Sequence, residues 1–393
     1  MTVMMAGASA PSPFYPTIQE KFGLAPVILT LVFAVYAVAL LATLLLAGSM
    51  SDYLGRRPVV SAGFFLLAGS LVLFWLAGDS VALMFARLLQ GIASGLLLSA
   101  LGAAIADLEP SGEPGAASAW NSLSALAGLA FGALAAGFSL LVLGETGGSA
   151  VTFVSLSVSS LMSAGATWLL PETSTRRKGI WRSLLPRISV PLRGRKHFLD
   201  AIPVFASGWA TGGLYLSLGT SLLTKVFEER SPFNGWLVVT LLAGSGALMG
   251  FLARRWKSKA ISLYGAASLA AGSALTIVSV LLGSQWLFHV AVVITGTGFG
   301  TAFPGALHSI LTTVEASRRA ETMSAVFVVC YLAFSVPAVA AGAAVPVAGL
   351  SVTVLWYAGA VALLAISSVV LILMRRDHTS GVRECRRTLP LDS

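Results

Sequence analysis

The sequence predicts an all-α polytopic membrane protein that crosses the bilayer about twelve times, as two bundles of six helices. Of 393 residues, 56% are hydrophobic and 10% are charged, whereas about a quarter of the residues in a soluble domain are charged. The apolar residues form long blocks, each close to the ~20 residues that a helix needs to span the hydrocarbon core. The Lys and Arg residues gather in alternate connections between these blocks, as they do in membrane proteins of fixed orientation.

Eleven blocks are apolar enough to form spanning helices. A helix keeps its backbone hydrogen bonds internal, as lipid requires. The expected helices are 25–47, 59–77, 81–106, 119–143, 150–170, 201–224, 236–252, 260–282, 286–313, 323–347 and 352–374.

The segment before residue 25 is the twelfth expected helix. Its apolar stretch, 1–16, is too short to cross about 30 Å of hydrocarbon, and no basic residue precedes it. We therefore expect a truncated first helix, because either the true start lies upstream or the chain is a fragment. A cleaved signal peptide ending near Ala8 to Ala10 is the alternative, although its basic leader is also absent.

The basic residues predict the orientation and the division of the chain. Of the 25 Lys and Arg, 21 lie in connections on one side; Lys21, Lys225 and Arg230 lie on the other, and Arg87 lies inside a block. Because positively charged connections stay in the cytoplasm, both ends should be cytoplasmic, in the inner or plasma membrane. The expected parts are an N-terminal bundle (1–170), a basic cytoplasmic linker (171–199), a C-terminal bundle (200–374) and a cytoplasmic tail (375–393).

Composition excludes several other classes of function. The formal net charge of +9 does not indicate nucleic-acid binding, because the basic residues do not form a stripe with interleaved aromatics. The two cysteines, Cys330 and Cys385, cannot build a disulfide framework or a metal cluster. No Ser/His/Asp grouping and no phosphate-binding glycine loop is present, so neither an enzyme nor an ATP-driven pump is expected.

The run GSMSDYLGRRP, which begins at Gly48, is the most specific motif. Gly48 allows a neighbouring helix to approach closely, and Gly55 permits a tight turn. Asp52 can face the positive N-terminus of another helix, while Arg56 and Arg57 stay at the surface. The run resembles motif A of the major facilitator superfamily, GxxxDxxGRR, at every defining position.

A second resemblance lies on the fourth expected helix, where Arg87 begins the run RLLQG. This run is similar to motif B of the same family, in which the arginine is associated with proton transfer. An ionisable group inside the membrane is also a functional candidate on physical grounds. We therefore expect Arg87, Gln90 and Gly91 to take part in proton coupling, the alternative being an arginine whose long side chain reaches the outer interface.

Two acids extend the motif A resemblance. Glu172, in Pro171-Glu172-Thr173, resembles the PET signature that follows the sixth helix in many members, and Asp107 ends the fourth helix. Motif A arginines in the family often pair with an acid at that place. We expect Asp52, Arg56 and Asp107 to form a gate network that stabilises one access state; the alternative is independent caps and loop charges.

The fifth expected helix departs from the family pattern. Gly128, Gly132 and Gly137 resemble the antiporter motif C in part, but the expected Gly-Pro step is Gly132-Ala133 here. Small residues at this spacing also form simple packing surfaces. All 16 acidic residues lie in connections, at helix ends or in the tail, so His308 is the remaining titratable candidate for coupling, its alternative being a hydrogen-bonded packing residue.

Substrate contacts are expected from polar or aromatic side chains near the bilayer midplane. The candidates are Tyr36, Trp209, Tyr215 and Tyr331, with Gln90. Each of the aromatic residues has the alternative of facing lipid or the interface. Because hydrogen-bonding groups are sparse, a hydrophobic or amphipathic solute is expected.

The family resemblance implies a monomeric secondary transporter that works by alternating access and binds no cofactor. Its partners would be a small-molecule substrate, protons and the lipid bilayer. We expect proton-coupled export, as an antiporter, of small organic, drug-like molecules. The alternatives are an importer of a sugar, organic acid or other metabolite and, from another class, a non-transporting membrane receptor or lipid-modifying enzyme.

Overall fold

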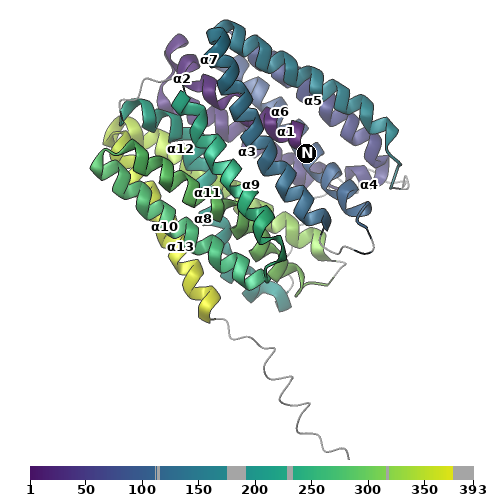
Figure 1. Ribbon diagram of the computed structural model, residues 1–393. Helices are drawn as coiled ribbons and strands as arrows, with labels where there is room; N and C mark the ends of the chain where they lie inside the picture. Colours follow the sequence, from purple (N-terminus) through teal and green to yellow (C-terminus); the bar gives the residue numbers. More distant parts are fainter. Residues whose placement is uncertain (111, 113–115, 175–191, 228–232, 316–317, 375–393) are drawn as a thin grey trace, which may run out of the picture.

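The computed structural model describes residues 1–110, 112, 116–174, 192–227, 233–315 and 318–374, and all regular elements among them are helices (Figure 1). Most of the expected linker, the expected tail and Arg230 lie outside the described residues. The elements are α1 (Thr2–Ser9), η1 (Ser12–Phe14), α2 (Tyr15–Lys21), α3 (Pro26–Ala47), α4 (Met50–Leu54), α5 (Arg56–Trp75), α6 (Ser80–Asp107), α7 (Ala116–Ala166), η2 (Thr167–Leu169), α8 (Leu192–Lys225), α9 (Phe233–Leu252), η4 (Ala253–Arg255), α10 (Ser258–Leu282), α11 (Gln285–Leu311), α12 (Arg319–Ala348) and α13 (Leu350–Met374).

Nine helices among the described residues are long and apolar enough to cross a membrane. One of them, α7, consists of two arms that turn back on each other at Gly144, where φ is 70° (Figure 1). The Ser139 hydroxyl on the first arm lies 2.5 Å from that of Thr152 on the second. With both arms counted, and with α8 added, the structure has eleven helical segments that match the eleven apolar blocks. The all-α polytopic fold is therefore confirmed.

The N-terminal segment continues further than the sequence predicted. Its three short helices follow one another from Thr2 to Lys21, and the residues that join them keep right-handed helical backbone angles. Prolines lack the backbone N–H and interrupt the helix, which explains the division into pieces. At 1.5 Å per residue the path extends about 30 Å. Met4, Ala6 and Ala10 are buried, so this segment is part of the core and does not end near Pro16.

Small residues bring several helices into close contact. An added Cβ at Gly91 on α6 would lie 2.7 Å from the Cβ of Ala39 on α3, and one at Gly246 on α9 would lie 2.8 Å from the carbonyl oxygen of Gly296 on α11. Tight packing of this kind is how helices associate in lipid, where apolar burial alone provides little driving force. Both glycines therefore allow close helix packing in this structure.

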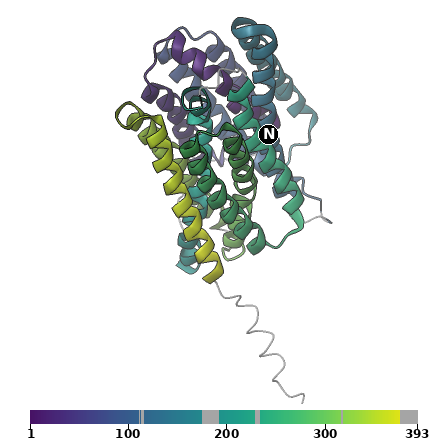
Figure 2. The ribbon, with the colours of Figure 1, turned by 60° about the vertical axis from the view of Figure 1, so that its left-hand side comes forward.

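Two pairs of helices join the N-terminal and C-terminal parts of the chain. α3 packs against α12, and α7 packs against α9; we call these two contacts the seam. Buried Ala37 and Leu40 of α3 form one apolar cluster with Tyr331 of α12. At the other contact, the Cβ of Ala130 on α7 lies 3.9 Å from the position that a Cβ would take at Gly244 on α9. In both ribbon views the second arm of α7 and α13 lie at opposite edges of the molecule (Figure 2).

Candidate functional site: a gate network, a buried arginine and an aromatic cluster

Arg56 is the centre of an ionic network at the end of the molecule where α4 meets α5. Its guanidinium donates to Asp52 at 2.5 Å, to Ser51 at 2.6 Å and, through Nε, to Asp107 of α6 at 3.1 Å. The arginine side chain is 13% exposed, whereas Asp52 and Asp107 are 45% and 34% exposed. The three residues that the sequence placed in a gate network therefore meet, and they join α4, α5 and α6 at one point.

Glu172, which follows η2, connects the end of α7 to this network. Its carboxylate accepts hydrogen bonds from the backbone N–H groups of Arg56 at 2.8 Å and of Arg57 at 3.1 Å. These two groups belong to the first turn of α5, whose free N–H groups and positive dipole end favour a carboxylate. Thr173 adds a hydrogen bond from its hydroxyl to Asp107 at 2.7 Å. The PET resemblance thus identified a residue that caps α5.

Gly55 makes the turn that allows this capping. Its φ of 98° and ψ of 154° lie in a region that glycine adopts and other residues avoid. A Cβ there would also lie 2.7 Å from Oε2 of Glu172. The expectation of a glycine turn is confirmed, and the same glycine makes room for the capping carboxylate.

The position of Glu172 holds its pKa below the usual value. Its partial burial acts to raise the pKa of the carboxyl group. The backbone N–H groups of Arg56, Ser174 and Arg57, together with the charge of Arg57, outweigh that effect. Glu172 is therefore a carboxylate at neutral pH, and the cap does not depend on pH in that range.

Two expectations for the motif A run differ from the structure. The atoms nearest to an added Cβ at Gly48 belong to Leu44 of its own helix, so close approach of a neighbouring helix does not explain this glycine. Among the described residues the carboxylate of Asp52 bonds to Arg56 and not to the N-terminus of a facing helix, because the chain turns at Gly55 and the Arg56 side chain at the start of α5 reaches Asp52 on α4. Arg57 contributes its backbone N–H, and its enclosed Nε has no hydrogen-bond partner among the described residues.

Arg87 of α6 is enclosed by the protein and does not reach the interface. Its side chain is 1% exposed. One terminal nitrogen donates to Gln90 Oε1 at 2.6 Å, and the other donates to the hydroxyl of Tyr15. Gln90 in turn donates to the carbonyl oxygen of Gly7 at 2.8 Å. The arginine and glutamine of the motif B run therefore hold the N-terminal segment against α6, and Nε of Arg87 is left without a partner among the described residues.

Aromatic rings surround the Arg87 guanidinium. The ring centroids of Tyr15, Phe33, Tyr36 and Phe74 lie between 5.3 and 5.6 Å from its central carbon. At such distances the negative face of a ring attracts a cation. Tyr36 was expected near the substrate, whereas Tyr15, Phe33 and Phe74 were not identified. The sequence signal that could have pointed to Tyr15 is a lone tyrosine between prolines at the end of a short apolar segment.

Several aromatic side chains of α3, α8 and α12 gather at the contact between α3 and α12. The rings of Trp209 and Tyr331 meet edge to face with centroids 4.7 Å apart, and Tyr36 packs in the same cluster. Phe334 lies 6.4 Å from Trp209 and 6.4 Å from Phe33. We call Tyr36, Trp209, Tyr331 and Phe334 the seam aromatics. Three of the four aromatic residues expected at the substrate cavity therefore meet at one place.

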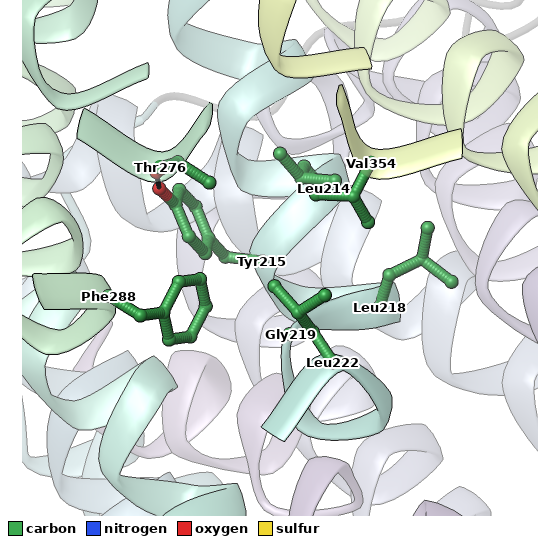
Figure 3. A pocket seen from close by; sticks show the side chains of 8 residues that line it. All are labelled: Leu214, Tyr215, Leu218, Gly219, Leu222, Thr276, Phe288 and Val354. Atoms are coloured by element: carbon green, nitrogen blue, oxygen red, sulfur yellow. Dashed lines mark hydrogen bonds between the residues drawn. The ribbon is translucent and has the colours of Figure 1, made fainter. Parts of the chain in front are cut away.

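Tyr215, the fourth, lies elsewhere. Its hydroxyl is 2.6 Å from that of Thr276 and 3.4 Å from that of Thr295, inside the packing of α8, α10 and α11. Figure 3 shows it beside Phe288 at a hollow in the C-terminal part, which leaves no space for a water molecule. The structure thus separates Tyr215 from the seam aromatics.

The remaining candidate residues are His308, Gly91 and the glycines that resemble motif C. His308 is exposed near the end of α11, so the structure does not bring it next to Arg87. Gly91 packs against α3, where an added Cβ would lie 3.1 Å from the backbone nitrogen of Leu40. Among the glycines that resemble motif C, Gly132 faces Ala6 of α1 and Gly137 faces the Trp236 ring of α9.

Comparisons with known proteins point to one family. A family model described as Major Facilitator Superfamily matches residues 1–338. The multidrug resistance protein MdtL of Shewanella oneidensis is 35% identical over 82 residues, and the match spans 20% of this chain and 20% of that protein. The aligned region is therefore about one fifth of the length of this relative.

Proposed function

Because the chain belongs to the major facilitator superfamily and is a transporter of that family, we propose that it exports small organic molecules across the cytoplasmic membrane in exchange for protons. Its many apolar helices make it a multi-pass membrane protein. The orientation, the coupling ion and the direction of transport are parts of the proposal, as is its action as a monomer in two six-helix bundles, 1–170 and 200–374.

The observation that carries the proposal is the Arg56 network in the N-terminal part of the chain. Arg56 connects α4, α5 and α6 through Asp52 and Asp107, and Glu172 adds the segment after α7. These contacts join one end of four elements through carboxylates that are partly open to solvent, so they can break and form again. A breakable ionic link within the N-terminal part, together with the apolar seam between the two parts, supports alternating access, in which one bundle rocks against the other around a central site.

Charge supports the orientation. Arg56, Arg57 and the basic residues after α9 (Arg254, Arg255, Lys257 and Lys259) lie on the side with most of the Lys and Arg. Since basic connections remain in the cytoplasm, this end is assigned to the cytoplasm. The network then acts as a cytoplasmic gate, and its breakage accompanies the opening of that side.

The multidrug relative and the aromatic seam support a drug-like substrate. The name of MdtL describes multidrug resistance, and the seam aromatics provide an apolar surface rather than a set of hydrogen-bonding groups. Arg87 and Gln90 are the proposed participants in proton coupling. Arginine does not lose its proton in proteins, so their role is to respond to charge, with the proton carried by another group.

Accumulation of dyes tests this function. Wild type, Asp52→Asn and Glu315→Gln would be expressed in an efflux-deficient bacterium, and the accumulation of a panel of cationic, neutral and anionic dyes would be measured with and without a protonophore. Glu315 is an exposed acid beyond the end of α11 and serves as the matched control. We expect lower accumulation for wild type and for Glu315→Gln, with the protonophore and Asp52→Asn each abolishing the effect.

Results that differ from these expectations would support one of the alternative transport functions. Higher accumulation that depends on the proton gradient would indicate an importer. Unchanged accumulation of a whole panel of dyes and antibiotics, with the protein confirmed in the membrane, would contradict multidrug export and leave a dedicated metabolite carrier.

A further inference from the structure

Arg87 carries a permanent charge that the described residues surround with neutral groups. The side chain is 1% exposed, and its hydrogen-bond partners are the amide of Gln90 and the hydroxyl of Tyr15. Among the described residues, Arg56 pairs with Asp52 and Asp107, and no acidic side chain pairs with Arg87. A charge inside a membrane protein is costly unless an opposite charge or a full set of hydrogen bonds compensates it.

The guanidinium also has unused capacity to bind. It has five N–H donors in a planar fork that fits carboxylate, sulfonate or phosphate oxygens. The two hydrogen bonds to Gln90 and Tyr15 use one donor on each terminal nitrogen, and the buried Nε has no partner among the described residues. Nε and the terminal nitrogen beside it form an edge that can hold two oxygens of one anion.

The buried arginine lies one layer of rings from the seam. Phe33 and Tyr36 contact the guanidinium on one side. On the other side, Phe33 faces Phe334 of α12 with ring centroids 6.4 Å apart, and Tyr36 packs with Tyr331. Separation of α3 from α12 would therefore expose these two rings and open a path to Arg87.

We propose that Arg87 binds the anionic group of the transported molecule, and that the substrates are amphipathic organic anions whose apolar body contacts the seam aromatics. This inference rests on the proposed transport function and adds a substrate class to it. The anion supplies the compensating charge for Arg87, and the rings provide a surface for an aromatic or aliphatic body. A neutral molecule of the same shape leaves the arginine uncompensated and binds more weakly.

Two probes of the same shape test the charge preference in the wild-type protein. 1-Naphthalenesulfonate is a permanent anion, and 1-naphthalenesulfonamide is its neutral counterpart. Equilibrium binding of each to the purified full-length chain would be measured in detergent. We expect the sulfonate to bind at least tenfold more tightly. Equal affinity for the two probes would overturn the proposal, whatever the variants do.

Variants then test whether Arg87 is the residue that favours the sulfonate over the neutral sulfonamide. Arg87→Gln should remove the difference between the two probes, and Arg87→Lys should retain part of it, because lysine keeps the charge but not the planar fork. Arg254→Gln, in which a basic side chain bonded to the carbonyl oxygen of Phe251 is neutralised, is the control and should bind like wild type. A preference that survives in folded Arg87→Gln would overturn the assignment to Arg87.

Flux separates this inference from the function on which it rests. Counterflow of the sulfonate in proteoliposomes should occur with wild type and fall at least tenfold with Arg87→Gln. Proton-driven export of ethidium without any preference for the sulfonate would support transport and contradict the anion site. Binding of the sulfonate that depends on Arg87, without flux of any probe, would support the anion site and contradict the transport proposal.

Discussion

At the scale of single residues, the candidate site contains two arginines, Arg56 and Arg87, whose surroundings differ. Arg56 meets two carboxylates, Asp52 and Asp107, that are open to solvent on one side, and such contacts can break and form again at modest cost. Arg87 is fully enclosed by neutral and aromatic groups. The first arrangement suits a gate that opens and closes, and the second suits the recognition of charge.

Replacement of Gly55 by alanine should weaken the proposed gate. The φ of 98° disfavours any side chain, and the new Cβ would crowd Glu172 at 2.7 Å. We expect Gly55→Ala to lower the free energy of unfolding by about 1–3 kcal/mol and to reduce transport. Gly69→Ala is the control, because Gly69 is an exposed position of the same α5 helix with open space around it. Thermal unfolding in detergent measures both, and equal melting temperatures would contradict the strain argument.

Glu172→Gln should destabilise the protein in a way that depends on pH. The pKa of Glu172 is lowered in the folded protein, so its contribution to stability is present above the unfolded pKa and is lost as pH falls through the folded pKa. Because solvent screens this exposed group, the effect should stay below about 1 kcal/mol.

Melting temperatures of wild type and Glu172→Gln, measured over a pH series, check this prediction. Their difference should be constant between ~pH 6 and ~pH 8 and should shrink in acid below the usual carboxyl pKa. A difference in melting temperature that grows as the pH falls would be the opposite pH dependence and would exclude the capping role.

At the scale of the helices, close packing through glycine sets the arrangement. An added Cβ at Gly298 of α11 would lie 2.7 Å from the carbonyl oxygen of Gly265 and 2.8 Å from the backbone nitrogen of Leu269, both on α10. These are backbone atoms that cannot move aside without shifting the whole helix. The contact between α10 and α11 therefore depends on the absence of a side chain.

Gly298→Val should accordingly separate α10 from α11. Overpacking of a close contact costs about 1–3 kcal/mol, and we expect a lower melting temperature and a smaller monodisperse fraction on size exclusion. Gly359→Val on α13, where an added Cβ meets open space, should behave like wild type. If the two variants have the same melting temperature, the close contact is not important for stability.

The sequence predicted where the helices lie along the chain better than it predicted which side chains of different helices pack together. The apolar blocks, including the division between 143 and 150, follow from length and hydropathy, and Gly55 follows from its motif. The helices are apolar on most sides, however, so no polar face indicates how each one is rotated. For that reason Tyr215 was grouped with Trp209 although the structure separates them, and Tyr15 was missed beside Arg87.

At the scale of the whole molecule, the seam decides whether one part of the chain can move against the other. Apolar and aromatic side chains fill the contact between α3 and α12, and at the contact between α7 and α9 Ala130 lies by Gly244 and Gly137 faces the Trp236 ring. Such surfaces lack a dense set of directional bonds that would have to break. This property fits two bundles that rock about a central site.

A disulfide across the seam tests this motion. The Cβ of Ala130 lies 3.9 Å from the Cβ position of Gly244, within the range for a disulfide. The pair Ala130→Cys/Gly244→Cys would be made in a chain with Cys330 and Cys385 replaced by serine. After oxidation this variant should lose about 90% of its flux or more, because transport requires motion of the bundles. Reduction of the disulfide should restore the flux. The single variants should be unaffected by oxidant, and full flux after complete cross-linking would contradict movement at this contact.

The most direct test of the central claim is proton-driven flux through the purified protein. Proteoliposomes with an acidic lumen would be given ethidium or an anionic dye outside, and the uptake of each dye followed over time. Export in exchange for protons predicts uptake that requires the pH gradient, disappears with a protonophore, survives in Glu315→Gln and is lost in Asp52→Asn. The same uptake in protein-free liposomes, or no gradient-dependent movement of any probe by folded, monodisperse protein, would contradict the account.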